Sequence, residues 1–334
     1  MMTSEQDEIA ATASALLADR VPVVGRGHDH VAATEIDAGL WQTCADLGWL
    51  GLGLPEAQGG VGFGLTEEAV LFRELGRYVV PGPFLPGVLG AQLAAAAGDG
   101  DLAASIASGA VRVALGTTVG VARVGAVSTA QLSLAHVEEA ALVVVADDGG
   151  AALVDIDACG VEVVDPVEGT VSAGRGRIEE VAAVASVDAA TAPIFLHGLV
   201  LAAAISTGVA EAAMAVAVEY AGQRIQFGKP IGVNQAIKHR CADMAVRSDG
   251  AWSQVCYAAV AVSSRLPGAA EEAAIAKYFA DEAARTNAAG AVQVHGAIGF
   301  TSEATPHRYV NRAHLMARTL ASRAALLDRV VGRS

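Results

Sequence analysis

Three patterns of hydrophobic and polar positions follow one another along the chain. In residues 1–110, apolar side chains recur every three or four positions, which predicts an N-terminal helical domain. Residues 111–187 consist of short, valine-rich runs separated by Gly, Asp and Pro, which predicts a small middle β domain. In residues 188–334 the helical spacing returns over four long segments. The sequence therefore predicts a mostly helical α+β protein that ends in a four-helix bundle.

The β domain is predicted from valine-rich runs and from one turn. Asp147, Asp148, Gly149 and Gly150 lie between two apolar runs, and glycine lowers the cost of the positive φ angles that tight reversals need. The pattern indicates antiparallel hairpins with no long helix between the strands. The predicted strands lie in VRVALG, ALVVVADDGGAALVDID, VEVVDP and TVSAGRGRIEEV.

The helices of the C-terminal domain are bounded by Pro, Gly or Ser, and the second carries the apolar stripe of a bundle helix. The first includes Ala189 to Ala210, 22 residues without a charge, which is long enough to span a bilayer. Small residues dominate this stretch, and Pro193 and His197 interrupt it, so we expect a buried bundle helix. The four helices are predicted near 191–223, 233–265, 269–292 and 306–331.

Composition and charge exclude several classes of function. The 22 basic and 36 acidic side chains leave a formal charge of −14, which repels nucleic acid and anionic membrane surfaces. Only 17% of residues are charged, against about 25% in an average domain. Because 53% are hydrophobic, we expect part of the surface to be covered by subunit interfaces.

The cysteines and the N-terminus point to the cytoplasm. Cys44, Cys159, Cys241 and Cys256 form no Cys-x-x-Cys pair, so neither disulfides nor a zinc site is signalled. The N-terminal residues are acidic where a secretory signal would be basic and then apolar, so no export is expected. The glycine-rich stretch 51–64 lacks the βαβ context of a phosphate-binding loop and is predicted to be a turn-rich connection.

Two segments of the bundle carry the candidate chemistry. In YAGQRIQFGKPIGVNQAIKHRCADM, Arg224 lies at the end of a helix, where a cation is also favoured by the helix dipole alone. In AVQVHGAIGFT, Gly296 and Gly299 end a helix beside Gln293 and His295, which a glycine C-cap alone also explains. Together they offer a guanidinium, carboxamides and exposed backbone N–H groups. These are the groups that hold a dinucleotide pyrophosphate outside a Rossmann fold.

The sequence resembles the acyl-CoA dehydrogenase family over nearly the whole chain. The resemblance is carried by LWQTCADLGWLGLGLPEAQGGVGFG, FRELGR, RIQFGKPIGVNQAIKHRCADM and AVQVHGAIGFTSEATPHRYVNRA. It implies a flavoprotein with a helical, a β and a bundle domain, and with FAD as cofactor. In that family, the last two motifs reach across a subunit interface to the ADP part of a neighbour's FAD. By resemblance this role falls to Arg224, Phe227, Asn234, Gln235, Gln293, His295 and Gly296.

The family reaction needs a carboxylate base. It removes the α-proton of an acyl thioester while the β-hydrogen leaves as hydride to the flavin. In most members this Glu follows, by nine residues, an arginine that matches Arg312, and Ala321 occupies that position here. Other members place it at the start of the first bundle helix, which falls near Gly198. Neither position has a carboxylate, so we assign no catalytic residue.

The middle domain also departs from the family pattern. Family members carry Gly-Ser-Asp after the first strand and a Trp-Ile-Thr strand, both at the flavin ring. This chain reads GTTVGVARVGAVS from Gly116 to Ser128 and has no Trp-Ile-Thr. Loss of the base and of the ring contacts, with retention of contacts to a neighbour's FAD, indicates half of a shared active-site system.

Other titratable residues are weighed as alternatives. Glu211 and Glu219 lie eight residues apart on one helix face, and we expect a solvated face or an intersubunit ion pair. Glu303 matches an acidic residue of the family motif and is interpreted as structural. His295, His307 and His314 are too dispersed to predict a metal site.

The leading hypothesis is therefore a subunit of a heteromeric acyl-CoA dehydrogenase, paired with a paralogue that carries the catalytic Glu. The arrangement resembles the α2β2 enzymes that actinobacteria use on CoA thioesters of steroid side chains. An electron-transfer flavoprotein or another acceptor is implied as a further partner. Two alternatives stay open: a homo-oligomeric dehydrogenase with a relocated base, and a flavin-free scaffold.

Overall fold

The computed structural model describes residues 3–23, 36–119, 130–166, 168–179 and 181–332. Its N-terminal part is helical, as predicted. Helix α1 begins with a reciprocal cap, because the Gln6 N–H donates to Thr3 Oγ1 (3.2 Å) and the Thr3 N–H donates to Gln6 Oε1 (3.1 Å). The elements are α1 (Ser4–Arg20), α2 (Ala38–Asp46), the 3-10 turn η1 (Glu56–Gln58), α3 (Leu65–Arg77), α4 (Phe84–Ala96) and α5 (Gly100–Ala107).

The middle domain is one sheet with the strand order β5-β6-β2-β1-β3-β4-β7. The predicted hairpin is confirmed: β3 and β4 are antiparallel with Asp147 opposite Gly150, and the Gly149 N–H donates to Asp147 Oδ1 (2.8 Å). The expectation of antiparallel pairing is wrong for one pair, since β1 and β3 are parallel. The strands are β1 (Val113–Val119), β2 (Ala130–Ala135), β3 (Leu142–Asp147), β4 (Gly150–Asp155), β5 (Glu162–Val164), β6 (Ala173–Ile178) and β7 (Ala185–Asp188), with the 3-10 turn η2 (Ile156–Cys159) after β4.

The C-terminal part forms the predicted bundle, with one correction. The helix expected over 306–331 is two helices, because residues 317–322 leave the helical conformation. Leu320 has a φ of 67°, and Ser322 Oγ accepts from the Ala325 N–H (3.2 Å) to start a new helix. The elements are α6 (Ile194–Gln223), β8 (Ile225–Gln226), β9 (Lys229–Pro230), η3 (Ile231–Val233), α7 (Gln235–Ser263), α8 (Ala269–His295), η4 (Gly296–Phe300), α9 (Pro306–Met316) and α10 (Arg323–Val330).

Helix α6 is the centre of the fold. It is long and apolar enough to cross a membrane, but 78% of its most apolar window is buried inside the protein, which confirms the predicted bundle helix. It crosses α3 at backbone contact: a Cβ on Gly208 would lie 2.0 Å from Arg73 O, and one on Gly76 would lie 2.1 Å from Ile205 O. Glycine at both positions therefore allows the N-terminal domain to pack directly on the bundle.

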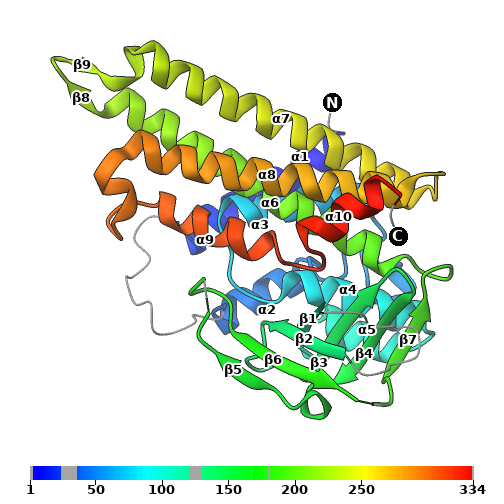
Figure 1. Ribbon diagram of the computed structural model, residues 1–334. Helices are drawn as coiled ribbons and strands as arrows, with labels where there is room; N and C mark the ends of the chain where they lie inside the picture. Colours follow the sequence, from blue (N-terminus) through cyan, green and yellow to red (C-terminus); the bar gives the residue numbers. More distant parts are fainter. Residues whose placement is uncertain (1–2, 24–35, 120–129, 167, 180, 333–334) are drawn as a thin grey trace.

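The bundle lies across the β domain, with the N-terminal helices packed behind and between them (Figure 1). The hairpin β8–β9 projects from one end of the bundle, away from the sheet, and the C-terminal end of α8 lies at this same end (Figure 1). At the other side, Arg329 on α10 forms an ion pair with Asp148 in the β3–β4 turn. The hairpin end of the bundle therefore lies away from the described strands of the chain's own sheet (Figure 1).

Candidate cofactor-binding site

The hairpin between α6 and α7 presents Arg224 and Phe227. Arg224 is the C-cap of α6, its N–H donates to Tyr220 O (2.8 Å), and its exposed guanidinium forms no ion pair within the described residues. Phe227 and Gly228 form the two-residue turn between β8 and β9, with φ angles of 51° and 76°. Phe227 is fully exposed. A bulky residue at positive φ with its ring in solvent is unfavourable on both counts, so Phe227 is a candidate for contact with a ligand.

The start of α7 adds two carboxamides. Asn234 is the N-cap of α7, and its Nδ2 donates to Ile231 O (3.0 Å), so its Oδ1 is left to accept from a ligand. Gln235 is the first residue of α7 and is exposed. Both side chains lie one short turn from the hairpin. The predicted order of a helix, a tight turn and a second helix is confirmed.

The second predicted segment is the C-terminal end of α8. Gln293 is exposed, His295 is the last helical residue, and Gly296 ends the helix with a φ of 68°. The His295 ring stacks on Tyr220 of α6, with centroids 4.2 Å apart and planes 20° apart. This contact joins the ends of α6 and α8, so the structure brings the two sequence-distant segments to one end of the bundle (Figure 1).

This set of groups suits a phosphate-bearing dinucleotide. A guanidinium and carboxamides donate hydrogen bonds to phosphate oxygens, and an exposed aromatic ring offers a stacking face. The segment from Tyr220 to Ala242 contains Arg224, Lys229, Lys238 and Arg240 and no acidic residue, in a chain whose net charge is −14. The residues at this end therefore fit the ADP part of FAD.

The two family base positions lie in the interior, and the residue before one of them contacts the other. A Cβ on Gly198 would lie 2.8 Å from the Leu320 side chain and 3.0 Å from Leu89. Ala321 follows Leu320 and is buried. Gly198 therefore faces apolar neighbours, Ala321 belongs to the hydrophobic core, and neither residue carries a proton acceptor. The flavin-ring segment, Gly116 to Ser128, lies outside the described residues from 120 onward.

Between the sheet and the bundle lies a hollow of about 50 Å³, lined by residues of α3, α4, β1, α6 and α9. Ligand pockets usually enclose about 300–1,000 Å³. His136 lines the hollow, and its buried Nδ1 has no hydrogen-bond partner within the described residues. Burial, helped by the nearby Arg312, lowers the pKa of His136 to about 3, so its imidazole is neutral at pH 7. Sequence analysis gave no signal for this residue.

A buried polar cluster next to the base positions was also missed. Glu68 Oε2 lies 2.5 Å from His197 Nε2, and Gln92 Nε2 donates to Glu68 Oε1 (2.8 Å). Glu68 is buried, and the absence of a side chain at Gly53 makes room for its carboxylate. Three different helices supply these side chains, so no local motif announces them.

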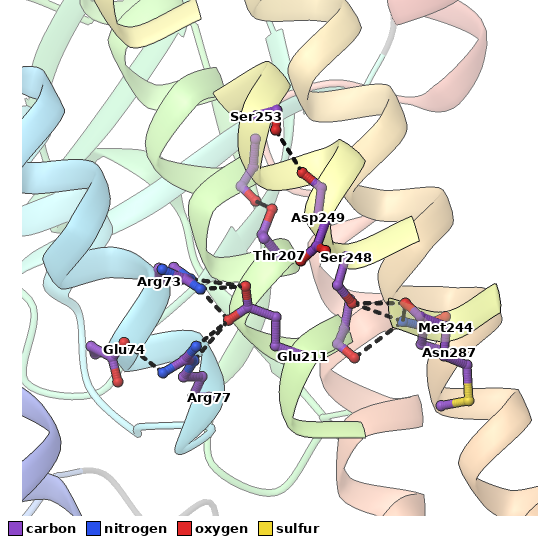
Figure 2. A network of polar contacts seen from close by, with 12 residues as sticks. Arg73, Glu74, Arg77, Thr207, Glu211, Met244, Ser248, Asp249, Ser253 and Asn287 are labelled. Carbon is purple, nitrogen blue, oxygen red and sulfur yellow. Dashed lines mark hydrogen bonds and ion pairs between the residues drawn. The ribbon is translucent and has the colours of Figure 1, made fainter. Parts of the chain in front are cut away.

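The acidic residues weighed as alternative bases differ in burial and in hydrogen-bond partners. The expectation for Glu211 is wrong, because it is buried and paired within its own chain with Arg73 and Arg77 (Figure 2). Its position beside the glycine crossing of α3 and α6 explains this difference. Glu219 is exposed, as expected, and accepts from Gln223 (3.1 Å). Glu303 is exposed.

Comparison with known proteins identifies the family of the chain. Residues 3–105 match the model of the acyl-CoA dehydrogenase N-terminal domain, and residues 188–321 match that of the C-terminal domain. The acyl-CoA dehydrogenase IpdE2 of Mycobacterium tuberculosis is 34% identical over 298 residues, covering 88% of this chain and 86% of its own.

Two solved structures share the whole fold. A variant of the Tcur3481–Tcur3483 steroid ACAD superposes with a TM-score of 0.87 at 27% identity, covering 98% of this chain and 97% of that chain. The ChsE4–ChsE5 complex from Mycobacterium tuberculosis gives a TM-score of 0.83 at 25% identity, covering 100% of this chain and 97% of that chain. The chain belongs to the acyl-CoA dehydrogenase family.

Proposed function

We propose that this chain is a subunit of a heteromeric, FAD-dependent acyl-CoA dehydrogenase, paired with a paralogue that carries the catalytic Glu. One observation carries the proposal. The donor groups for a dinucleotide are exposed at the bundle end remote from the chain's own sheet, whereas both base positions are apolar. A chain with these features supplies contacts to a site that another chain completes.

The residues of this chain bind and orient the cofactor. Arg224 donates charge-assisted hydrogen bonds to a pyrophosphate oxygen, and Phe227 covers an apolar face of the dinucleotide. The carboxamides of Asn234, Gln235 and Gln293 offer both donors and acceptors to the ribose and the phosphates. The chemistry that bound FAD would supply is acceptance of the β-hydrogen of an acyl thioester as hydride. The proton from the α-carbon goes to the partner's carboxylate.

The reaction is the α,β-desaturation of an acyl-CoA thioester, and the substrate class is a steroid side-chain CoA. The steroid assignment is supported by the similarity to the Tcur3481–Tcur3483 steroid ACAD. The heteromer is supported by the similarity to the ChsE4–ChsE5 complex. The enzyme works in the cytoplasm and passes electrons to an electron-transfer flavoprotein or another acceptor.

Co-expression with such a paralogue tests the proposal. We expect a stable heteromer with FAD bound across the interface, and a chain that retains little flavin when purified alone. A cofactor at 100 times its Kd stabilises the assembled state by about 2.7 kcal/mol, so FAD should raise the melting temperature of the heteromer and barely change that of the lone chain. Size-exclusion chromatography with flavin absorbance measures the assembly and its flavin content, and thermal melts with and without FAD measure the change in melting temperature. A stable homotetramer of this chain with one FAD per subunit would contradict the proposal.

One observation favours the alternative of a relocated base. The Glu68–His197 pair lies within a turn of Gly198, and a carboxylate that orients an imidazole is a common arrangement for a general base. If the lone chain is yellow and oxidises acyl-CoA, this alternative replaces the heteromer. If no combination of chains binds flavin, the scaffold alternative holds.

Substitution of Arg224 tests the cofactor contact. We expect Arg224→Ala to weaken FAD retention in the heteromer, because one charge-assisted contact contributes about 1.5–3 kcal/mol. The fold should not change, since the side chain is exposed. Flavin absorbance at matched protein concentration measures the loss. Arg285→Ala, which removes another exposed guanidinium, on α8, is the control; equal flavin content in both variants would remove Arg224 from the cofactor site.

A further inference from the structure

A groove of about 720 Å³ lies on the β domain, beside the edge strand β5. Its walls are the turn between β2 and β3, the 3-10 turn η2, strand β5 and the start of β6. Ligand sites usually enclose about 300–1,000 Å³, so the groove is large enough to hold part of another molecule. Strand β5 lies on the side of the sheet away from the bundle, remote from the hairpin β8–β9 (Figure 1). The groove is therefore separate from the groups that the proposed function uses.

The walls of the groove are mainly apolar. Val137, Ile156 and Val161 line it and pack against the smaller hydrophobic cluster of the β domain. Val163 of β5 lines it as well, and 73% of this residue is exposed. A single exposed apolar residue needs no explanation, but this one lies on an edge strand, where other chains can pair. The groove thus offers apolar surface that a neighbouring chain can cover.

Strand β5 also offers unpaired backbone groups. It is the last strand of the described sheet, and its strand partner is β6, with Val164 opposite Ala173. One edge of β5 therefore has no neighbouring strand, whereas β7, at the other edge of the sheet, packs against α4. An extended segment of another chain can add to an unpaired edge through main-chain hydrogen bonds, and pockets for its side chains then give specificity.

The rim of the groove is acidic. Glu138, Asp157 and Asp165 line it and are exposed, and none of the described residues that line it is basic. Their carboxylates form no ion pair or hydrogen bond within the described part of the chain. Arg175 lies opposite Glu162 in the strand register, and neither of them lines the groove. Two copies of this edge would bring like charges together, so charge complementarity favours a basic partner over a second copy.

We propose that this groove docks an extended, basic and apolar segment of another protein, which adds to β5 as a further strand. Apolar side chains of the segment cover Val163 and the walls, and its Lys or Arg side chains reach the carboxylates of the rim. The groove follows an unpaired strand and is open to solvent along the exposed rim, which suits an extended chain better than a compact small molecule. Because these contacts involve neither FAD nor the bundle, the inference goes beyond the proposed function and does not depend on it.

Binding of a model peptide to the full chain, alone or in the heteromer, tests the proposal. The probe is the fluorescently labelled heptapeptide Val-Val-Lys-Lys-Val-Val-Lys, in which each face of the extended chain carries both valine and lysine. We expect saturable binding in fluorescence anisotropy, weaker at high salt because the carboxylates are exposed. Hydrogen exchange of residues 162–164 should slow in the complex, because strand pairing protects amides. The same peptide with Glu in place of each Lys should bind at least about tenfold more weakly.

Substitutions in the groove locate the binding. Val163→Lys places a like charge against the basic probe and should weaken binding by at least about tenfold, whereas Val163→Thr keeps the branched shape and should bind almost as the wild type. Asp157→Asn combined with Asp165→Asn should weaken binding several-fold at low salt. Asp101→Asn, beside the other edge strand β7, is the control and should change nothing. All these side chains are exposed, so unchanged urea midpoints are expected.

A probe methylated on all its backbone nitrogens separates a strand from other occupants. It keeps the side chains but cannot donate the hydrogen bonds of a ladder, so we expect it not to bind. Equal binding of the methylated probe would show that the groove takes side chains without a strand, and the proposal would be wrong. It would also be wrong if the unmodified probe did not bind at about 1 mM, or if the chain self-associated through this edge and Val163→Lys abolished that association. None of these results changes the flavin content of the heteromer, which tests the proposed function separately.

Discussion

Glu211→Gln is expected to destabilise the protein by about 3 kcal/mol and to leave α-proton exchange in the assembled enzyme unaffected. Arg73 donates to both carboxylate oxygens of Glu211, with Nε to Oε2 at 2.8 Å and Nη2 to Oε1 at 2.6 Å. Arg77 Nε donates to Oε2 (2.7 Å) and its Nη1 pairs with Glu74 (3.0 Å), as Figure 2 shows. A neutral amide at position 211 leaves the two adjacent guanidinium groups of Arg73 and Arg77 with one carboxylate, that of Glu74.

The burial of these groups makes the loss large. Glu74 is buried, and desolvation raises its pKa against the opposing effect of Arg77 and Arg73, so it is a weaker anion than an exposed carboxylate. Arg73 also stacks on Trp252 of α7, with the guanidinium carbon 4.4 Å from the ring centroid. The cluster therefore joins α3, α6 and α7, which belong to different parts of the sequence.

Glu219→Gln is the matched control, because Glu219 lies on the same helix and is exposed. Urea denaturation should show a lower midpoint for Glu211→Gln and almost none of this change for Glu219→Gln. Equal midpoints would show that the cluster does not hold the N-terminal helices on the bundle. Loss of α-proton exchange in a folded, flavin-loaded Glu211→Gln variant would make Glu211 a base and favour the homo-oligomeric alternative.

Side-chain periodicity predicts the helices and the β3–β4 hairpin because both depend on local spacing. Periodicity does not predict pairing between strands that are distant in the sequence. Strand β2 reads AQLSLA, which alternates in burial but lacks the valines on which the prediction depended. The parallel pairing of β1 with β3 is decided by the whole sheet. No turn chemistry near either strand indicates it.

In the candidate site, too, residues with a local signal are predicted from the sequence, and residues brought together by packing are not. Arg224 and Gly296 are predicted from helix ends, which leave local signals, and Phe227 from the family resemblance; the structure places all three at the turns that end α6 and α8. Glu68 and His197 are 129 residues apart, and His136 and Arg312 are 176 apart, so only the packing of the helices and the sheet brings them together. Glu211 was misinterpreted because its partners lie on α3.

Lys277→Met is expected to destabilise the protein by about 3–5 kcal/mol, because it leaves a buried carboxylate without its cation. Lys277 is fully buried and forms an ion pair with Asp281, whose Oδ1 accepts from Ser206 Oγ (2.7 Å). Lys277 Nζ also donates to Met316 O (2.7 Å) at the end of α9. This last contact caps a carbonyl at the C-terminal end of α9. It holds the start of the segment 317–322, which contains the family base position Ala321.

The pH dependence of this variant has a definite sign. Burial already raises the pKa of Asp281, and removal of Lys277 takes away the main interaction that lowers it. When folding raises the pKa of a carboxyl group, the group does not destabilise the folded state at a pH below its pKa in the unfolded chain, about 3.9. As the pH rises above that value, the group lowers the free energy of unfolding. The deficit of Lys277→Met should therefore shrink as the pH is lowered from 7 towards 4, in urea melts compared with the wild type at each pH.

A double variant separates the charge from the packing. Lys277→Met with Asp281→Leu removes both charges and keeps apolar volume, and replacing a whole buried ion pair in this way is often close to neutral. We expect it to recover most of the stability that Lys277→Met loses. Hydrogen exchange of residues 317–322 should be faster than in the wild type in both variants, because neither restores the Lys277 contact to Met316 O, which among the described residues then accepts only from the Thr319 N–H (3.0 Å). If the single variant unfolds at the wild-type urea concentration, the buried Lys277–Asp281 pair does not hold α9 on α8.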